Sequence, residues 1–346
     1  MSALSTMLSV LCKKYGLGTM QGEPLAVKGG LLHRMYRVTT DQGDYAVKLL
    51  NPDIMKRPQA MNNMIVSERI ARQLAQEPNA LPAVAALAWE ERQLLSLDTT
   101  DGLAADCALQ YALVYPWLEA RSLFAPEIGV SHCRQIGRML GRIHSAGLDA
   151  GELELSREET GRSPYDWQGY LTLAQKQDVP WLRDYEAMLP DLTRWDLAAT
   201  EAMETVSAHQ VVSHRDLDPK NVLWQGEQPY LIDWEAAGVV NPCQELLEIL
   251  NYWCNDENGC LDSSRCQALL AEYTRYMNLG DVDWMPVFAV SYDGMLGWLE
   301  YTLKKALGIE KDEDAQGASQ MTGTYRELQR YEAQAGQLRQ ILETSI

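Results

Sequence analysis

The sequence predicts an α+β protein of two lobes, a small antiparallel β lobe followed by a larger, mainly helical lobe. In the first 115 residues, short apolar or alternating runs separated by turn residues are typical of strands. Beyond residue 116, apolar residues recur mainly at helical spacing. Pro116 lies where the pattern changes and interrupts the last strand of the first part. We therefore predict two domains, 1–115 and 116–346, in a chain long enough to hold both.

The N-terminal lobe is predicted to begin with a helix, because apolar residues recur at helical spacing between Leu4 and Tyr15. Asp41, Gln42 and Gly43 indicate a hairpin turn between two of the strands that follow. One helix is predicted over 61–76. Strands are predicted over 25–27, 35–40, 45–50, 84–89, 93–97 and 108–115.

The C-terminal lobe is predicted to be helical around one short group of strands. The strands cover 211–212, 222–224 and 230–232, and Pro219 forbids a helix in the loop 214–221 between them. The predicted helices cover 131–146, 167–176, 181–188, 192–207, 243–252, 261–276, 282–307 and 325–342.

The composition limits the classes of partner. A net charge of -18 argues against binding to nucleic acid or to an anionic membrane surface, since both would repel it. The seven cysteines show no spacing typical of a disulfide framework or a zinc site, which favours a reducing cytoplasm. Neither a secretory signal nor an apolar run of about 20 residues is present, so we expect a soluble, cytoplasmic protein.

Polar residues with a specific spacing lie between Val211 and Glu235. His214 and Asp216 are followed by Asn221 five residues after Asp216. Asp233 comes twelve residues later, after an apolar run. Phosphoryl transfer needs a carboxylate that orients and deprotonates the acceptor hydroxyl, together with oxygen ligands for magnesium on the nucleotide phosphates. The alternative is a polar turn in which Asp and Asn only cap the backbone.

HRDLDPKN followed by LIDWE resembles the catalytic and metal-binding motifs of the aminoglycoside phosphotransferase family, which includes choline kinases and other small-molecule kinases. The resemblance implies a protein-kinase-like fold, with ATP or GTP as phosphoryl donor. It also implies that Asp216 is the catalytic residue and that Asn221 and Asp233 are ligands of Mg²⁺. Asp218 departs from the family, which often has His there, so whether it faces the phosphates or the acceptor stays open.

Lys48 lies in the otherwise apolar strand YAVKLL, where burial of a lysine without an anion is costly. The family resemblance implies that it pairs with the nucleotide phosphates and that Glu68, on the next helix, holds it in an ion pair. Gly29 and Gly30 could let backbone amides approach those phosphates. The alternative for Lys48 is a solvated lysine on an edge strand. The alternative for Glu68 is a solvated helix face, and the alternative for Gly29 and Gly30 is an ordinary turn.

The family resemblance also suggests roles beside the catalytic loop. The backbone around Val114, Tyr115 and Trp117 is expected to meet the adenine edge of the nucleotide. His144 is interpreted as a structural residue. Glu245 lies where the family commonly has Asp, with an effect that the sequence does not define.

The acceptor is expected to be a small molecule, because Pro242 opens a helix nine residues after Asp233 and leaves no room for the activation segment of a protein kinase. The acidic balance favours a cationic or polyhydroxylated acceptor, with an aminoglycoside-like amino sugar ahead of choline, ethanolamine and other amino alcohols, and ahead of neutral sugars or macrolides. The alternatives are an inactive nucleotide-binding module and a protein kinase, and the protein could be a monomer or a homodimer. The candidate acceptor residues are Glu235, Asp256, Glu257, Glu300, Trp253 and Trp298.

Overall fold

The computed structural model describes residues 2–27, 33–97, 110–153, 155, 161–311 and 315–345. The chain divides into two compact units that alternate along the sequence. The first, here the sheet unit, comprises Met1–Leu123, Gly151–Leu155 and Pro219–Gly238. The second, here the helical unit, comprises Phe124–Ala150, Ser156–Asp218 and Val239–Ile346. The predicted α+β class is confirmed, and the domain division after residue 115 stays a prediction.

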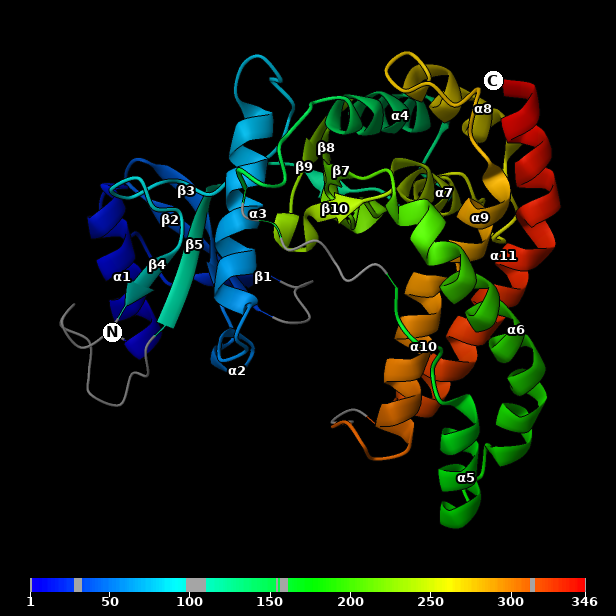
Figure 1. Cartoon of the computed structure of the whole chain (residues 1–346). Coiled ribbons are helices and arrows are strands. Elements are labelled where there is room, and N and C mark those ends of the chain that lie inside the picture. The colour runs from blue at the N-terminus through cyan, green and yellow to red at the C-terminus, as the bar shows by residue number, and fades with distance from the viewer. Residues whose placement is uncertain are drawn as a thin grey trace. The chain divides into compact units, whose positions relative to one another are not determined.

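The sheet unit contains an antiparallel five-stranded sheet with the order β1-β2-β3-β5-β4 (Figure 1). The hairpin turn predicted at Asp41 joins β2 to β3. In the centre of the sheet, Lys48 on β3 pairs in register with Leu113 on β5. The strands are β1 (Leu25–Val27), β2 (Arg34–Thr40), β3 (Gly43–Leu49), β4 (Leu95–Leu97) and β5 (Gln110–Pro116).

Helices cover both faces of this sheet. Because successive side chains of a strand point to opposite faces, Val47 and Leu49 of β3 pack with α1 (Ala3–Tyr15). Leu113 of β5 packs on the other side, in a cluster with Met64 of α3 (Ala60–Ala75). A short helix, α2 (Pro52–Met55), precedes α3. Lys48, which alternates with Val47 and Leu49, therefore points to the α3 side of the sheet.

The strand predicted over 84–89 is wrong. The amides of this segment donate to three different parts of the chain and so form no continuous ladder. Val84 donates to the carbonyl of Leu231 and Leu87 to that of Val114, while the amide of Ala86 donates to the carboxylate of Glu68. Alternating apolar residues predicted a strand because they are buried, but burial alone does not specify which partners the backbone takes.

The remaining part of the sheet unit holds a three-stranded sheet, β6-β8-β9. It is formed by β6 (Arg121–Ser122), β8 (Val222–Gln225) and β9 (Gln228–Leu231). A single 3-10 turn, η2 (Pro219–Asn221), precedes β8, where we predicted a loop without helix. Proline is tolerated at the first position of such a turn, because its missing N–H would have no partner there. A second 3-10 turn, η3 (Trp234–Ala236), follows Asp233 and packs against α3.

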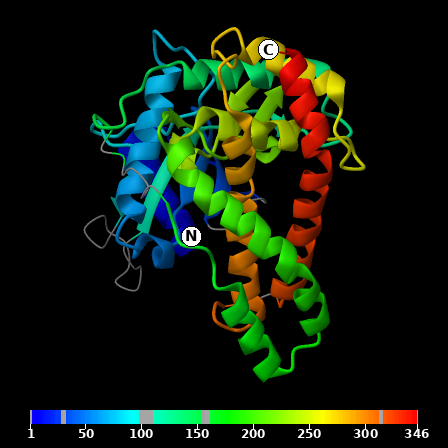
Figure 2. The ribbon, with the colours of Figure 1, turned by 45° about the vertical axis from the view of Figure 1, so that its right-hand side comes forward.

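The helical unit contains eight helices in its described part, with α10 and α11 lying side by side (Figure 2). Strands β7 (Val211–Ser213) and β10 (Gly238–Val240) pair beside them. No helix of the described residues is long and apolar enough to cross a membrane. The helices are α4 (Val130–His144), α5 (Trp167–Gln177), α6 (Leu182–Ser207), α7 (Pro242–Trp253), α8 (Ser263–Tyr273), α9 (Trp284–Val290), α10 (Asp293–Ala306) and α11 (Gly317–Ser345).

The largest differences from the predicted helices occur at three places. The helices predicted over 181–188 and 192–207 are one helix, α6, which continues through Pro190. Pro190 is exposed, so the carbonyl that loses its intrahelical partner can bond to water, while the buried residues on both sides of Pro190 keep the two halves packed. The helix predicted over 282–307 is divided into α9 and α10. The last helix, α11, begins at Gly317, earlier than predicted.

Candidate active site

The ammonium group of Lys48 is held by two carboxylates that follow β9. Its Nζ donates to Oδ1 of Asp233 at 2.8 Å and to Oε2 of Glu235 at 2.7 Å. Lys48 is only 8% exposed, so these anions replace the water that a buried ammonium loses. Strand β3 thus places Lys48 beside the predicted metal ligand Asp233. Glu235 of η3, which we had predicted to contact the acceptor, binds Lys48 instead.

Opposite charges dominate the ionisation of this group. Burial lowers the pKa of Lys48, but Asp233 and Glu235 outweigh it and the pKa is raised overall. For Glu235, burial raises the pKa, but the opposing effects of His33 and Lys48 are larger and bring the pKa down to about 2. Nε2 of His33 lies 3.4 Å from Oε2 of Glu235, and its Nδ1 accepts from the amide of Asn51. Lys48 and Glu235 are therefore both charged near neutral pH.

Glu68 does not form the expected ion pair with Lys48 in the described part of the chain. It lies on the buried face of α3, where one carboxylate oxygen accepts from the amide of Ala86 at 2.7 Å and the other from the hydroxyl of Tyr115. Burial raises the pKa of Glu68. Helical spacing correctly predicted Glu68 on α3. Its oxygens accept from Tyr115 and from the 84–89 segment, and the sequence did not predict that these groups lie next to Glu68.

Asn221 and Asp233 are positioned by neighbouring elements of the sheet unit. Asn221 is buried at the end of η2, and its carbonyl accepts from the amide of Ile232 at 3.0 Å. Asp233 has φ of +60°, a left-handed conformation that is uncommon for a residue with a side chain and clusters at functional sites. Because Ile232 directly precedes Asp233, the backbone hydrogen bond between Ile232 and Asn221 holds the two predicted ligands, Asn221 and Asp233, near one another.

The donor set fits a magnesium ion bound together with phosphates. Mg²⁺ prefers oxygen ligands and is usually held by one or two protein side chains, with substrate phosphates and water completing its coordination. Asn221 supplies an amide oxygen and Asp233 a carboxylate whose side chain is 39% exposed. Among the described residues no group of three His, Cys, Asp or Glu side chains could hold a metal ion.

The segment expected to meet the adenine edge ends strand β5. The carbonyl of Val114 accepts from the amide of Leu87, and the N–H of Trp117 donates to the carbonyl of Asp44. Tyr115 directs its hydroxyl to Glu68, and burial raises the pKa of this phenol well above its usual range. The N–H of Trp117 is therefore already satisfied within the protein. Gly29 and Gly30 lie outside the described residues.

The loop that we predict to be catalytic, 214–221, begins in the helical unit, where Glu245 supports it. The Oε1 atom of Glu245 accepts from the amide of Arg215 at 2.7 Å, and Oε2 bonds to Nε2 of His144 at 2.7 Å. Arg215 has φ of +63°, so the residue directly before Asp216 also adopts the left-handed conformation. His144 is completely enclosed and bonds to Tyr273 through Nδ1. The structural interpretation of His144 is confirmed.

A hollow of about 400 Å³ lies in the helical unit beside the loop residue Asp218. We refer to it as the α7–α11 pocket, because α7, α10 and α11 supply most of its lining. Its residues are Asp218, Glu248, Asn251, Tyr252, Asn255, Ser291, Gly294, Met295, Trp298, Thr324, Glu327, Arg330 and Tyr331.

Glu248 is the unusual member of this pocket. Within the described part of the chain its carboxylate forms no hydrogen bond or ion pair. Burial and the nearby charges of Glu245 and Asp216 raise its pKa to about 8. A carboxylate in such surroundings gains most from a cation. One signal in the sequence could have identified it, because Glu248 is an acid three residues after Glu245 in a helix whose other residues are largely apolar.

Several residues expected to face the acceptor have other roles. Trp253 is fully buried, and its Nε1 donates to the carbonyl of Leu217 at 2.8 Å, so it supports the loop and is closed to a ligand. Glu300 is buried, accepts from the hydroxyl of Tyr170 and pairs with Lys304. Asp256 accepts backbone bonds in its own turn. Trp298, 48% exposed, does line the pocket, as do Tyr252 and Arg330, which we had not singled out.

Solved structures with the same architecture are protein-kinase-like phosphotransferases. The spectinomycin phosphotransferase APH(9)-Ia, in complex with ADP and spectinomycin, aligns with a TM-score of 0.67 over 92% of this chain and 93% of that chain, at 15% identity. A choline kinase from Cryptosporidium parvum Iowa II aligns with a TM-score of 0.56 over 91% and 90%, at 12% identity. The predicted protein-kinase-like fold is thus confirmed.

Residues 24–279 match the family model APH, described as the phosphotransferase enzyme family, and the chain belongs to this family. The resemblance drawn from HRDLDPKN and LIDWE is confirmed. Curated relatives include a homoserine kinase from Methylobacterium radiotolerans, 31% identical over 179 residues, which are 51% of this chain and 53% of that protein. A homoserine kinase from Zymomonas mobilis is 23% identical over 260 residues, 73% of this chain and 72% of that protein. The chain spans about half the length of the first of these relatives.

Proposed function

We propose that the protein is a small-molecule kinase that transfers the γ-phosphoryl group of ATP or GTP to the hydroxyl of a small amino alcohol. The acceptor class depends on one observation, the carboxylate of Glu248, which lines the α7–α11 pocket without a partner among the described residues. Family membership and the motif residues support the reaction type. Six described cysteines are free thiols, which supports a cytoplasmic location, and the protein could act as a monomer or homodimer.

The nucleotide is bound, in this proposal, by residues of the sheet unit. Lys48 stays protonated, and the N–H group that it does not donate to Asp233 or Glu235 would bind a phosphate. Glu68 fixes the positions of Tyr115 and the 84–89 segment. Asn221 and Asp233 would hold Mg²⁺, which neutralises charge on the β- and γ-phosphates. The backbone near Val114 and Tyr115 would meet the base, and Gly29 and Gly30 are proposed to approach the phosphates.

The chemical step breaks one bond and forms another at the γ-phosphorus. The acceptor hydroxyl oxygen attacks this phosphorus, the bond to the bridging oxygen of the diphosphate breaks, and the diphosphate leaves with the electron pair. Asp216 orients the hydroxyl and takes its proton. Glu245 holds the backbone of Arg215, and Trp253 holds the carbonyl of Leu217, so the residues on both sides of Asp216 are fixed. Positioning of this kind supplies much of the catalysis in phosphoryl transfer.

The α7–α11 pocket suits an acceptor that carries both charges of an amino acid. Glu248 would receive an ammonium group, and Arg330, which has no ion pair in the described part of the chain, would receive a carboxylate. Homoserine has this ammonium, a carboxylate and a primary hydroxyl, and the curated relatives are homoserine kinases. We therefore propose homoserine-type amino alcohols as the first acceptors to test.

An amino sugar is the second candidate, as the acidic composition first suggested. Trp298 presents an exposed ring to the pocket, and Tyr301 lies 5.5 Å away between ring centroids. Such an aromatic surface can pack against the apolar face of a sugar ring or against a quaternary ammonium. Choline and ethanolamine belong to the same test because they share the cation and the hydroxyl.

A screen of nucleotide consumption tests the proposal. The full-length protein is assayed with ATP or GTP and magnesium against homoserine, ethanolamine, choline, 2-deoxystreptamine and neutral sugars. We expect turnover of homoserine or another amino alcohol, weakened by added salt because charged groups recognise it. Turnover of neutral acceptors alone would contradict the role of Glu248 while preserving the kinase. Nucleotide binding without any transfer would favour the inactive module.

A further inference from the structure

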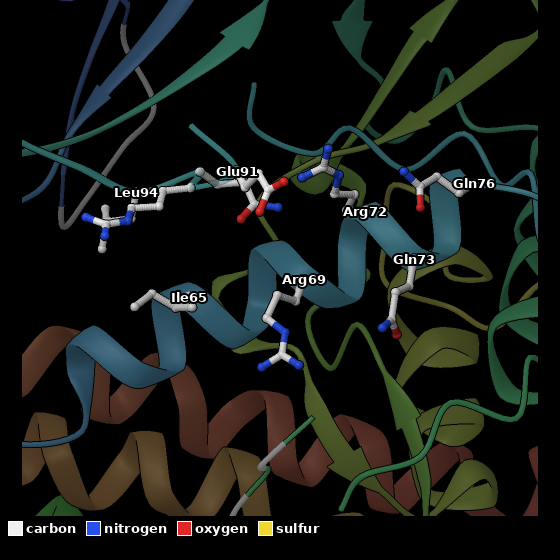
Figure 3. Close-up of a pocket in the computed structure, with 9 residues that line it drawn as sticks. Ile65, Arg69, Arg72, Gln73, Gln76, Glu91 and Leu94 are labelled. Carbon is white, nitrogen blue, oxygen red and sulfur yellow. The ribbon is translucent and has the colours of Figure 1, made fainter. Parts of the chain in front are cut away.

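A second hollow, of about 370 Å³, lies on the outer side of α3 in the sheet unit (Figure 3). We refer to it as the α3 pocket. Ile65, Arg69 and Arg72 extend from one side of the helix, and Glu91 and Leu94 lie across from them in Figure 3. The other lining residues are Gln73, Gln76, Arg92 and Gln93. Nothing in the proposed reaction uses this pocket.

The α3 pocket concentrates positive charge in an acidic protein. Arg69, Arg72 and Arg92 bring three guanidinium groups to its wall, whereas the whole chain carries a net charge of -18. None of the three forms an ion pair within the described residues, and Arg69 donates only to the backbone carbonyl of Glu152, at 3.2 Å. Glu91 contributes one negative charge, so the lining keeps a net charge of two. Guanidinium groups gathered in this way are stabilised by an anion.

Gln93 points to a ligand independently of these charges. The residue is only 8% exposed, and its side-chain amide has no hydrogen-bond partner among the described residues. Its backbone carbonyl, by contrast, accepts from the hydroxyl of Tyr15 at 3.0 Å. Its amide atoms are not enclosed by the protein and are accessible in the pocket, where an oxygen-bearing ligand would accept hydrogen bonds from the N–H groups.

We propose that the α3 pocket is an effector site for a small molecule with two negative charges, borne by carboxylate or phosphate groups. The net charge of its lining matches a dianion, and its volume suits a small metabolite. Arg72 and Arg92 bind the anionic groups, since a guanidinium donates two parallel bonds to either chemistry. Gln93 donates to an oxygen at the inner end.

The position of the site on α3 links it to the nucleotide side of the sheet unit. The pocket residues Ile65, Arg69 and Arg72 recur along one face of the helix, and Glu68 lies on the buried face, bonded to Ala86 and Tyr115. The same helix packs against η3, which follows directly after Asp233. A ligand that fixes α3 from outside therefore changes nucleotide affinity, and by linkage the nucleotide changes the affinity for the ligand to the same extent.

Binding is tested on the full-length protein without nucleotide, with succinate as the carboxylate probe and glycerol 2-phosphate as the phosphate probe. The readout is the half-saturation concentration of the thermal shift. We expect at least one probe to shift the melting temperature saturably, with half-saturation at least tenfold higher in the Arg72→Gln/Arg92→Gln variant. Arg183→Gln/Arg326→Gln, two exposed arginines of the helical unit, removes the same charge and should leave it unchanged. Response to one probe alone identifies the ligand chemistry.

Gln93→Leu separates a defined site from general attraction to positive charge. This variant keeps the net charge and the approximate size of the side chain. If the site is defined, its half-saturation concentration should be roughly threefold to tenfold higher, which is the effect of about one lost hydrogen bond. Absence of a saturable shift in the wild-type protein would overturn the site. Equal half-saturation in the wild-type protein and in the Arg72→Gln/Arg92→Gln variant would overturn it as well.

The coupling is tested by nucleotide affinity, which does not depend on turnover or on the acceptor. A fluorescent ATP analogue is titrated at fixed free magnesium with and without the saturating probe. We expect the dissociation constant to change at least threefold in the wild-type protein and to stay constant in the Arg72→Gln/Arg92→Gln variant. Binding of the probe without any effect on nucleotide affinity would overturn the effector role. The result is independent of whether the proposed acceptor is correct.

Discussion

The carboxylate of Glu245 and the backbone amide of Arg215 are joined by a hydrogen bond of 2.7 Å, which fixes the residue before Asp216. The second oxygen of Glu245 bonds to His144. Burial raises the pKa of Glu245, but His144 outweighs this effect and the pKa is lowered overall. The carboxylate is therefore ionised at neutral pH although it is buried in the helical unit. It accepts a hydrogen bond from the amide of Arg215 and bonds to the ring of His144.

Glu245→Ala should weaken both folding and catalysis. Removal of the carboxylate leaves the buried amide of Arg215 and the ring of His144 without a partner, which costs about 1–3 kcal/mol for each group. A small displacement of Asp216 would lower kcat by about a hundredfold. Glu245 is a positioning residue, so the KM for nucleotide should hardly change. Thermal unfolding and steady-state kinetics measure these effects. Glu245→Gln keeps an oxygen that can accept from the amide of Arg215, so it should lose less than Glu245→Ala, and Glu201→Gln at an exposed position is the control. An equal loss in nucleotide KM would argue against a role limited to the loop.

Asp216→Asn should lower kcat by about 10²–10⁴-fold, because an amide orients a hydroxyl but cannot accept its proton. Nucleotide affinity should stay within a few fold of the wild-type value. Asp218→Asn is the matched neighbour from the same loop, and because Asp218 lines the α7–α11 pocket, this change should act mainly on the KM of a cationic acceptor. Rapid-quench measurement of a single turnover separates the two. Wild-type turnover by Asp216→Asn would reject Asp216 as the base.

Most of the elements and the position of the loop that carries Asp216 could be predicted from local sequence. Pro219 limited the structure of the loop that carries Asp216, and the apolar strand YAVKLL identified Lys48 as a buried lysine. The three residues Asp216, Asn221 and Asp233 were recognisable because their spacing is set by one continuous stretch of chain. Local information of this kind does not depend on how distant segments pack.

The partners of those residues could not be predicted, because they come from segments far apart in the sequence. Glu235 lies close to Asp233 in sequence, yet only the packing of η3 brings it to Lys48. Glu68 has the expected helical position, but the sequence did not show that Tyr115 would occupy its carboxylate. Glu248 illustrates the same limit, since its surroundings come from α7, α10 and α11.

The acid stability of the sheet unit should depend on Glu235. Its pKa falls from an ordinary value near 4.5 to about 2 in the folded protein. Because the folded pKa is lower than the unfolded one, the stabilisation is present above about pH 4.5 and is lost as the pH falls towards 2. Glu235→Gln should therefore lower the melting temperature at pH 7 and reduce the further loss between pH 5 and pH 3. Melting followed by circular dichroism, with Glu201→Gln as control, measures both. A slope identical to that of the wild-type protein would contradict this assignment.

Glu248 should make the recognition of a cationic acceptor depend on pH. Its pKa is raised to about 8, so the carboxyl group is largely neutral at pH 7 and becomes a strong partner for an ammonium group only as the pH rises through 8. Ionisation of a group with a raised pKa also lowers the stability of the acceptor-free protein as the pH rises from about 4.5 through 8. We expect kcat/KM for the amino alcohol to rise several-fold between pH 6.5 and 8.5. Glu248→Gln should abolish this rise and increase the acceptor KM about tenfold, while leaving nucleotide KM unchanged. The same profile measured with a neutral diol acceptor controls for titration of other groups. A rise that persists in Glu248→Gln would assign the pH dependence to a different residue and remove the main support for an ammonium at this position.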